Sequence, residues 1–438
     1  MKLTRSALLA LSASLIAMPA LADGFSVYEV SARGVGMAGA MMFSDEASLI
    51  AYNPAGITHL DEKGTFSGSL TFIAPRGKTD FLMADGSKLN AHNKGNPAYV
   101  PAMFYARKVK DRNLWWGIGA FSRFGLKATY DHGWYGRFSG RNTELYTGSV
   151  TPTVAFKIGS KLSMSVNAEV MYARLKFDKS TKDFAPLGKE MEMRNPVAYK
   201  GMGALMSEVT TEVEGDSWGY GWGVGLNYDF DEHFSAAFLY RSEVKQTFEG
   251  DATFRPALKQ DMTIGTDVEG SVHLPESFTF GLGYRFNQNR TRVEFDAIRT
   301  NWSSYEDLTM KFKTPAAFQT VLGPSFTSTT PKYWENGWRY QFGIEHRLNQ
   351  RWTLRAGFVY DDCSSDNPKY ADYMVPTGVR RTYSVGASYR NRNVEYSLGF
   401  GYMSVGSKDI WASGANGEDS RLGSTYSTIV AAGVRVDL

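Results

Sequence analysis

From residue 65 to the C-terminus, large apolar side chains alternate with small or polar ones. The clearest stretch, 218–228, places Trp, Tyr, Val and Leu at even positions and mainly Gly at odd positions. Similar alternation recurs at 278–286, 394–402 and 428–437. Successive side chains of a β-strand point to opposite faces, so each stretch predicts a strand with one apolar face and one small or polar face.

The connections between these predicted strands alternate in length. Six are short: 110–113, 159–161, 229–233, 287–290, 348–350 and 391–393. Seven are longer: 77–96, 125–142, 178–215, 250–270, 314–332, 363–378 and 406–420. Tight turns at one edge and long loops at the other are typical of outer-membrane barrels. The layout predicts fourteen antiparallel strands, with both termini on the periplasmic side.

A soluble sandwich of two sheets would also alternate apolar and polar positions, but it gives no reason for alternating short and long connections. The mean hydropathy of −0.32 does not exclude a membrane barrel, whose strands average out as polar. Charged residues on the polar faces are expected to point into a lumen, because lipid would not tolerate them. They are Arg241, Glu243, Lys245, Arg285, Arg292, Glu294, Arg339, Glu345, Arg355, Arg390 and Glu395. Aromatic residues near the short turns predict an interfacial girdle: Trp115, Trp116, Phe230, Phe234, Phe286 and Trp352.

The segment 23–64 differs from everything after it. It is rich in Gly and Ala, and we expect Ser44 or Asp45 to cap a short helix and Asn53 to cap a second turn that starts at Pro54. A fourteen-stranded barrel has a lumen too wide for its own side chains to fill. The fold class predicted is an all-β membrane protein, a 14-stranded antiparallel transmembrane barrel (65–438) plugged by a small, partly helical N-terminal hatch (23–64).

Residues 1–22 predict a cleaved secretory signal peptide. Lys2 and Arg5 precede an apolar run from Ala7 to Ile16, and Ala20-Leu21-Ala22 fits the small-x-small cleavage rule. The chain is therefore expected to leave the cytoplasm and to reside in a bacterial outer membrane.

Several short motifs follow one another along the chain: Gly34-Val-Gly36 with Asn53-Pro54-Ala55, Phe124-Gly125-Leu126, Val170-Met-Tyr172-Ala-Arg174, Tyr240-Arg241-Ser242-Glu243-Val244-Lys245, Leu274-Pro275-Glu276, Asn301-Trp302-Ser303 and Tyr360-Asp361-Asp362. In this order they resemble the FadL family of outer-membrane long-chain fatty acid transporters, which includes TodX-type hydrocarbon channels. The likeness extends over essentially the whole mature chain.

The resemblance implies a monomeric barrel that takes up hydrophobic ligands passively. A ligand would land in a groove among the extracellular loops, move to a pocket in the lumen, and leave sideways at a kink in the third strand. Phe124, Gly125 and Leu126 match the kink, and Asn53, Pro54 and Ala55 match the moving part of the hatch. Lys179 matches one of two family residues that hold a carboxylate. The second is not matched, because Trp334-Glu335-Asn336 stands there; Lys332 is a candidate replacement.

Apolar residues in two long loops supply the predicted landing groove for an acyl chain. They are Leu187, Met191, Met202, Leu205 and Met206 in the first loop and Phe254 and Leu258 in the second. Methionine adapts its shape to irregular surfaces, which suits such a groove. The alternative is that these side chains only pack the loops on themselves.

Other chemistry finds little support in the sequence. Lys+Arg 48 against Asp+Glu 45 gives no basic patch for nucleic acid. One cysteine, Cys363, and six scattered histidines give no metal site, and Asp361, Asp362 and Asp366 do not complete a calcium loop. No cofactor is expected. A lipase would need a serine and a histidine on one face, and only His273 with Ser271 and Ser277 offers that.

The predicted function is passive transport of long-chain fatty acids, with no enzymatic activity. Uptake of alkanes or aromatic hydrocarbons is the alternative within this class, and a surface adhesin or phage receptor is the alternative from another class. The expected partners are a hydrophobic small molecule, the lipid bilayer with its lipopolysaccharide, and the outer-membrane assembly machinery. The chain ends in the apolar Leu438, where members of the family usually end in Phe.

Overall fold

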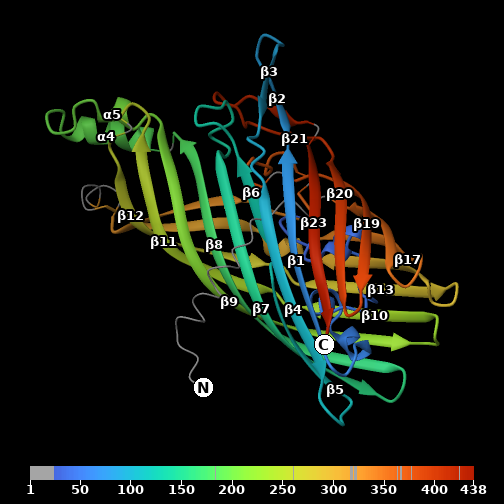
Figure 1. Cartoon of the computed structure of the whole chain (residues 1–438). Coiled ribbons are helices and arrows are strands. Elements are labelled where there is room, and N and C mark those ends of the chain that lie inside the picture. The colour runs from blue at the N-terminus through green and yellow to red at the C-terminus, as the bar shows by residue number, and fades with distance from the viewer. Residues whose placement is uncertain are drawn as a thin grey trace.

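In the computed structural model the strands form one closed antiparallel barrel with fourteen spanning strands. The structure describes residues 24–438 except 183, 260, 316–318, 320–322, 363, 366, 376 and 424, so the predicted signal peptide lies outside the described residues. The first strand pairs with both its successor and the last strand, which closes the sheet. Figure 1 shows the strands side by side around the wall, with the N-terminal helices inside it and the C-terminus beside them. The predicted fold class is confirmed.

Nine spanning strands are continuous: β1 (Thr65–Arg76), β4 (Ala98–Lys108), β7 (Asn142–Ile158), β8 (Leu162–Thr181), β9 (Val209–Asp229), β18 (Trp352–Asp361), β19 (Arg380–Asn391), β20 (Val394–Val405) and β23 (Thr425–Asp437). Five are divided in two: β5 (Leu114–Phe121) with β6 (Gly125–Thr129), β10 (Phe234–Arg241) with β11 (Val244–Pro256), β12 (Ile264–Leu274) with β13 (Ser277–Phe286), β14 (Thr291–Thr300) with β15 (Asp307–Lys313), and β16 (Ser325–Pro331) with β17 (Gly337–Arg347).

Short and long connections alternate as predicted, but several strands run further than expected into the predicted loops. β11 continues to Pro256 and β12 begins at Ile264, so most of 250–270 is strand. The connection between β8 and β9 contains the helices α4 (Ala185–Arg194) and α5 (Met202–Leu205). The first and last long connections form a small separate sheet, in the order β21 (Lys408–Ile410), β22 (Ser420–Leu422), β2 (Lys78–Leu82) and β3 (Lys88–His92). This sheet stands above the barrel in Figure 1.

The division between β10 and β11 corrects the predicted orientation of two charges. β10 pairs with β9 at Arg241↔Gly223, whereas β11 pairs with β9 at Glu249↔Asp216, so one extra residue enters the strand between them. An extra residue reverses which face the following side chains take. Arg241 is buried inside the barrel, whereas Glu243 and Lys245 are exposed on its outer surface. The prediction that these two face the lumen is wrong for this reason.

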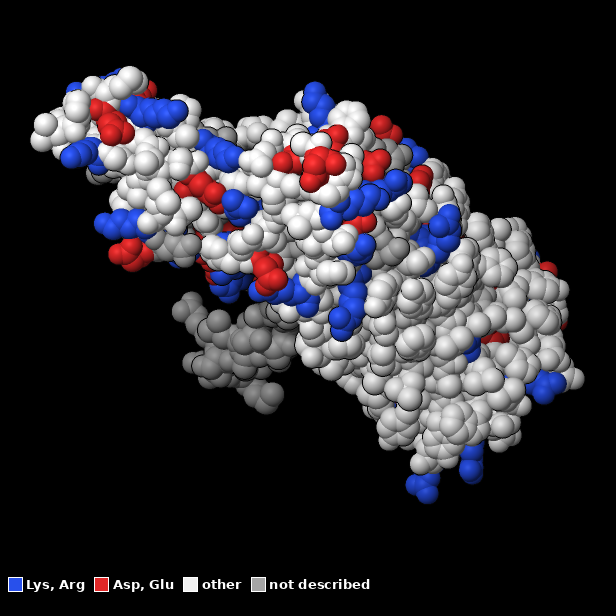
Figure 2. Space-filling model, turned by 90° about the horizontal axis from the view of Figure 1, so that it is seen from above, with Lys and Arg blue, Asp and Glu red and all other residues white. Residues whose placement is uncertain are grey.

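The outer wall carries the apolar face of the alternation. Large side chains such as Tyr383, Val385 and Leu398 are more than half exposed there. Seen from above in Figure 2, a broad uncharged area adjoins a rim that carries both signs of charge. Of the six predicted girdle residues, Trp115 is corrected: it is 5% exposed and points inward, where its Nε1 donates to the Leu60 carbonyl. Within the described chain, no helix is long and apolar enough to span a membrane.

The hatch consists of α2 (Ala32–Gly36), α3 (Leu49–Tyr52) and the 3-10 turn η1 (Pro54–His59). Its fit to the wall depends on inward glycines. A Cβ on Gly399 would lie 2.5 Å from the Ala32 carbonyl oxygen, and one on Gly357 would lie 2.4 Å from the backbone of Met37. The bare face of the alternating strands is therefore the surface on which the hatch rests.

The predicted helix caps are absent. α3 begins after Ser48 without a side-chain cap, and neither Ser44 nor Asp45 caps it. Asn53 does not cap η1; its amide donates instead to the Met42 carbonyl and to Asn227 Oδ1 of the wall. Pro54 does occupy the first position of η1, as expected. Contacts with the wall thus take the side chains of Asp45 and Asn53, whereas Ser44 Oγ has no hydrogen-bond partner among the described residues.

Charged contacts fasten the hatch to the lumen wall. Arg33, buried in α2, lies 2.6 Å from Asp45 and 2.9 Å from Glu345 of β17. Desolvation raises the pKa of Asp45, but Arg33, Arg435 and Arg347 outweigh it and hold that pKa well below its ordinary value of 3.8. A carboxyl with a lowered pKa stabilises the fold fully above its ordinary value and loses that effect only as the pH falls further. This fastening therefore persists through neutral and mildly acidic pH.

Replacing Arg33 with Met should loosen the hatch, because it removes a buried cation shared by Asp45, Glu46 and Glu345, although Arg355 remains 2.7 Å from Glu345. Loss of one partner from a buried ion pair destabilises by about 3–5 kcal/mol. Hydrogen exchange of the backbone amides at 31–53 in detergent measures the effect. The matched control is Arg347→Met, which removes a 3.2 Å contact to Asp45 from a side chain that is 52% exposed. An exposed pair contributes about 1 kcal/mol or less. Equal exchange in the two variants would contradict the role given to Arg33.

Candidate transport path

An outer pocket of about 260 Å³ lies inside the extracellular part of the barrel. Its lining is mostly apolar: Phe177, Phe184, Leu187, Phe254, Leu308, Met310, Phe312, Phe326 and Met374, with Lys179 and the hydroxyl residues Thr181, Thr211, Thr327, Ser328 and Thr330. Inward-facing positions of β8, β11, β15 and β16 supply most of these side chains. An apolar pocket with one cation and several hydroxyls suits an amphipathic molecule with an anionic head.

The outer pocket brings together three of the eight predicted substrate-binding residues: Lys179, Leu187 and Phe254. Phe254 does so from strand β11 rather than from a loop. Met191 packs behind Leu187, and Met202 and Met206 pack between α5 and the neighbouring apolar cluster. Leu205 is half-buried in α5, and Leu258 is 71% exposed on the connection after β11. These five residues support or surround the pocket without lining it.

Below the outer pocket, an aromatic cage encloses the first described residues of the chain. The ring of Phe25 lies 4.6 Å from Trp302, 5.7 Å from Tyr305, 5.9 Å from Trp334 and 6.1 Å from Phe124, measured between centroids. One buried apolar cluster contains this cage together with Phe254, Leu308 and Met310 of the outer pocket. The apolar side chains of the outer pocket and of the cage therefore belong to one packed cluster, and Phe25 fills the cage.

Polar contacts hold the N-terminal segment in the cage. Arg380 donates to the Gly24 carbonyl at 3.3 Å. The Arg339 guanidinium lies 4.2 Å from the centre of the Tyr28 ring. The sequence drew attention to Trp302 and Trp334 only as parts of motifs, and Phe25 and Tyr305 were missed. Their role depends on contacts between residues nearly 300 positions apart, which no local pattern reveals.

The predicted kink in the third spanning strand is a bulge beside the cage. Phe121 of β5 pairs with Ser149, and Gly125 of β6 pairs with Tyr146. Three residues, 122–124, thus oppose two residues of β7. An extra residue disrupts the ladder and bends the strand. Side-chain hydroxyls satisfy the freed backbone, since Ser122 and Thr147 both donate to the Phe124 carbonyl.

The N-terminal segment pairs with the other edge of this bulge. Val27 donates its N–H to the Arg123 carbonyl at 2.7 Å, and Gly125 donates to the Phe25 carbonyl at 2.6 Å. Ser26 and Phe124 form an isolated antiparallel bridge between these two bonds. The segment thus occupies hydrogen-bonding positions that a neighbouring wall strand would otherwise fill.

The wall ladder is open at the same place. β4 pairs with β5 only from Met103 to Lys108, whereas it pairs with β1 up to Ala98. Above the gap, Lys94 donates to the Thr129 carbonyl at 2.8 Å, which rejoins the two sides. The lumenal side of this gap is apolar, because Val100, Ala102, Phe104 and Phe121 are buried there. We call this interruption between β4 and β6 the wall gap.

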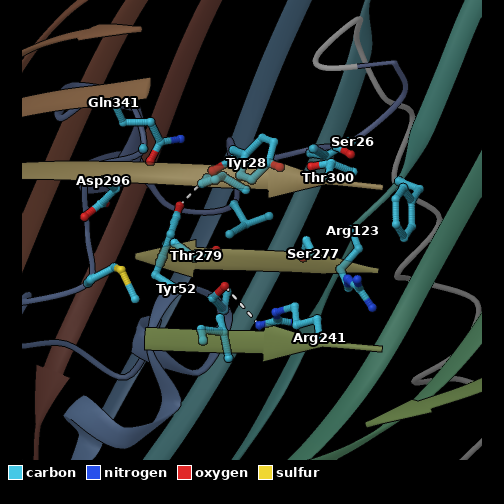
Figure 3. A pocket seen from close by; sticks show the side chains of 18 of the residues that line it. Ser26, Tyr28, Tyr52, Arg123, Arg241, Ser277, Thr279, Asp296, Thr300 and Gln341 are labelled. Carbon is cyan, nitrogen blue, oxygen red and sulfur yellow. Dashed lines mark hydrogen bonds between the residues drawn. The ribbon is translucent and has the colours of Figure 1, made fainter. Parts of the chain in front are cut away.

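A small inner cavity of about 60 Å³ lies between the hatch and the wall next to the bulge. Figure 3 shows Arg123 from the bulge and Arg241 from β10 close together at one end, and Asp296 and Gln341 at the other. Tyr52 of the hatch lies between the ends and donates to the Tyr28 carbonyl at 2.9 Å. Burial raises the pKa of Tyr52, which keeps its hydroxyl neutral.

Lys332, the candidate replacement for the unmatched lysine, is 2% exposed and forms an ion pair with Asp372. Its charge is therefore already compensated. Glu335 and Asn336 take up other contacts: the Glu335 N–H donates to the Ser364 carbonyl, and Asn336 accepts from the Ser303 N–H.

The Asn53-Pro54-Ala55 segment contacts the opposite side of the lumen. Asn53 is fully buried, and Ala55 lies against Gly225 of β9. Nearby, Thr58 Oγ1 lies 2.7 Å from Ser163 Oγ of β8, and His59 Nε2 lies 2.8 Å from Asp229. Residues 53–59 are thus hydrogen-bonded to two strands of the wall, Asn53 and His59 to β9 and Thr58 to β8.

Of the serine–histidine arrangement considered for a lipase, Ser271 shares the face of His273 as expected, with its Oγ 3.3 Å from Thr247 Oγ1, whereas Ser277 does not. His273 and Ser271 line an outward-facing hollow, where His273 Nδ1 lies 2.6 Å from Glu243. Ser277 lines the inner cavity, because the division at 275–276 reverses the faces of the strand. Among the described residues no group of His, Cys, Asp and Glu could hold a metal ion; Cys363 and Asp366 lie outside them.

A plugged outer-membrane barrel with an apolar internal path is the architecture of a transport protein. Residues 13–434 match the family model described as outer membrane protein transport protein (OMPP1/FadL/TodX). The chain belongs to this family, whose members are transport proteins and not enzymes, and it is located in the outer membrane.

Relatives and solved structures agree with this assignment. The long-chain fatty acid transport protein of Escherichia coli O6:H1 (strain CFT073) is 27% identical over 422 residues, which cover 91% of each chain. Outer membrane protein P1 of Haemophilus influenzae is 25% identical over 430 residues, covering 92% of this chain and 90% of its own. The crystal structure of a Pseudomonas aeruginosa FadL homologue matches with a TM-score of 0.78 at 18% identity, covering 94% of this chain and 99% of that one. The crystal structure of the Pseudomonas putida toluene transporter TodX matches with a TM-score of 0.72 at 16% identity, covering 94% of this chain and 99% of that one.

Proposed function

We propose that this protein carries long-chain fatty acids across the outer membrane by passive, ligand-gated diffusion that ends sideways through the barrel wall. The ligand enters the outer pocket, displaces the N-terminal segment from the aromatic cage, and leaves through the wall gap. The hatch, 23–64, closes the route straight down the lumen. The chain works as a monomer, inserted by the outer-membrane assembly machinery into a bilayer that contains lipopolysaccharide.

One observation carries this proposal. A single apolar cluster runs from the outer pocket to the cage, and the cage adjoins the one bulge that lies beside the wall gap. A hydrophobic molecule follows such a route without being exposed to water, and burial of its chain supplies the driving force at each stage. The names of the curated relatives, long-chain fatty acid transport protein among them, support the choice of ligand.

The N-terminal segment is well placed to couple binding to opening. Phe25 occupies apolar space that an acyl chain would fill, and the backbone of the same segment covers the bulge. A ligand that displaces the ring also removes the two backbone hydrogen bonds at Arg123 and Gly125. In this proposal Asn53, Pro54 and Ala55 accommodate the accompanying shift of the hatch.

Uptake of labelled oleate by cells that carry this protein as their one such transporter tests the proposal. The expected result is uptake well above that of cells with an empty vector. Uptake equal to the empty vector would contradict the fatty acid assignment. If the same cells then took up an alkane or an aromatic hydrocarbon, the alternative within this class would replace it. A surface receptor role for the loops predicts uptake of neither ligand.

The hydrocarbon alternative has one specific observation in its favour. Lys332 is already paired with Asp372, so the described residues offer the outer pocket only Lys179 as a lining cation. A neutral ligand needs no second cation. The TodX-type fold similarity does not decide between the two ligands, since it shows the fold alone.

Replacing Lys179 with Ala should weaken carboxylate binding selectively. A hydrogen bond to a charged group contributes about 1.5 kcal/mol or somewhat more, which corresponds to roughly tenfold in affinity. Binding of oleate and of a neutral alkane to the purified protein in detergent, compared by fluorescence displacement, measures the effect. Thr211→Ala, another lining residue without charge, is the control. Equal losses for both ligands would remove Lys179 from the site.

A further inference from the structure

The inner cavity contains a buried cation whose hydrogen bonds are incomplete. Arg241 is 6% exposed, and its Nη2 donates at 3.0 Å to the carbonyls of Ile50 and Ala51 in hatch helix α3. Its Nη1 is buried and has no hydrogen-bond partner among the residues described. In that same part of the chain no carboxylate forms an ion pair with Arg241. A buried, unsatisfied donor on a charged group is unfavourable unless something else binds it.

A second guanidinium stands beside it. Arg123 also lines the cavity from the bulge, and its Nη1 donates to Glu169 of β8 at 2.5 Å. Figure 3 shows both guanidiniums at the same end of the cavity, whereas Asp296 lies at the opposite end. Glu169 compensates one of the two charges, so this end keeps one cation without a carboxylate partner. The aromatic rings of Phe121 and Phe124 face the guanidiniums of Arg241 and Arg123 at 5.5 and 5.0 Å.

The position of this cation matters for the path. Phe121 and Phe124 are at the edge of the wall gap, so the cavity lies at the end of the proposed route. Its 60 Å³ admits a few water-sized groups, a carboxylate among them, but not an acyl chain. A carboxylate that leaves Lys179 must cross the apolar cage, and an ionised carboxylate without a partner in such surroundings is strongly disfavoured.

We propose that the inner cavity is a second binding site for the anionic head of the transported molecule, in which Arg241 Nη1, assisted by Arg123, receives the carboxylate beside the wall gap. The site rests on the proposed function and adds to it a stage that the outer pocket does not supply. It takes a monocarboxylate on an apolar chain. A neutral hydrocarbon gains nothing from it, so the site favours acids over hydrocarbons at the exit rather than at the point of binding.

Uptake of oleate and of oleyl alcohol, which has the same chain without the charge, tests this site in proteoliposomes or cells. Arg241→Gln should lower oleate uptake about tenfold, the size expected for losing a charge-assisted hydrogen bond. Uptake of oleyl alcohol should remain within about twofold of the wild type. Arg241→Lys, which keeps the charge, should retain most oleate uptake, and oleate binding to the outer pocket should not change in either variant.

Arg292→Gln is the matched control. Arg292 is also a buried wall arginine that donates to a hatch carbonyl, that of Phe43, but it does not line the inner cavity. Loosening of the hatch alone would affect both ligands in this control and in Arg241→Gln alike. Heat-modifiable mobility on gels verifies that each barrel is folded. Should Arg241→Gln fail to fold, Arg123→Gln combined with Glu169→Gln removes the assisting guanidinium together with its carboxylate but keeps Arg241, and should lower oleate uptake by less than tenfold while leaving oleyl alcohol uptake unchanged.

Each outcome decides between the proposals. Selective loss of oleate uptake supports the second site. Equal loss of both ligands, or no loss of oleate uptake, overturns it and leaves Arg241 as a fastening of the hatch. Wild-type protein that takes up only oleyl alcohol overturns the site together with the fatty acid assignment. Wild-type protein that takes up neither ligand contradicts the proposed function itself.

Discussion

Deleting Ser122 should abolish uptake of both acids and hydrocarbons while leaving a folded barrel. The bulge places three residues, 122–124, opposite two residues of β7. Removing one of them leaves two residues of the third strand opposite two residues of β7. The ladder can then continue from β5 into β6 without a bend. A continuous third strand can pair with the upper half of β4 and close the wall gap. Uptake should then fall to the level of cells that lack the protein.

Ser122→Ala is the control for this deletion. It removes the hydroxyl that donates to the Phe124 carbonyl but keeps the number of residues in the strand. Thr147 still donates to that carbonyl, so the bulge should persist and uptake should stay near the wild-type level. Heat-modifiable mobility checks the fold of both proteins. Normal uptake by a folded deletion variant would exclude exit through this gap.

The sequence predicts the barrel well because strand alternation and connection length are local properties. These two local properties predict fourteen strands, inward glycines and long extracellular loops. The structure confirms the resulting fold class. Orientation is less predictable, since a single extra residue reverses a strand. Glu243 and Lys245 were misplaced for that reason, and Ser277 was assigned to the face of His273 for the same reason.

The path itself is predictable only in part. Lys179, Leu187 and Phe254 meet in one outer pocket, whereas the prediction placed Lys179 with the carboxylate in the lumen and the other two in a landing groove among the loops. The aromatic cage could not be predicted, because Phe25, Trp302 and Trp334 come from three distant segments and meet only after the barrel closes. The same holds for the pairing of the N-terminal segment with the bulge. Its hydrogen bonds involve backbone atoms, which leave no trace in residue type.

A disulfide between positions 26 and 124 should lock the path shut. Ser26 and Phe124 are the directly opposed residues of the bridge, and the hydrogen bonds lie on either side of them, at Val27 and Gly125. Such a non-hydrogen-bonded pair has Cα atoms about 4.5 Å apart, which lies within the range that a disulfide spans. The double change Ser26→Cys and Phe124→Cys, with Cys363→Ser to prevent mispairing, ties the N-terminal segment to the bulge. Each single cysteine variant is a control for the lost side chain.

Uptake of labelled oleate by this locked variant, before and after reduction, tests most directly whether the N-terminal segment gates exit at the wall gap. The account predicts uptake at the empty-vector level in the oxidised protein and recovery to the level of the single cysteine variants after dithiothreitol. Undiminished uptake by protein shown by mass spectrometry to be fully oxidised would contradict it.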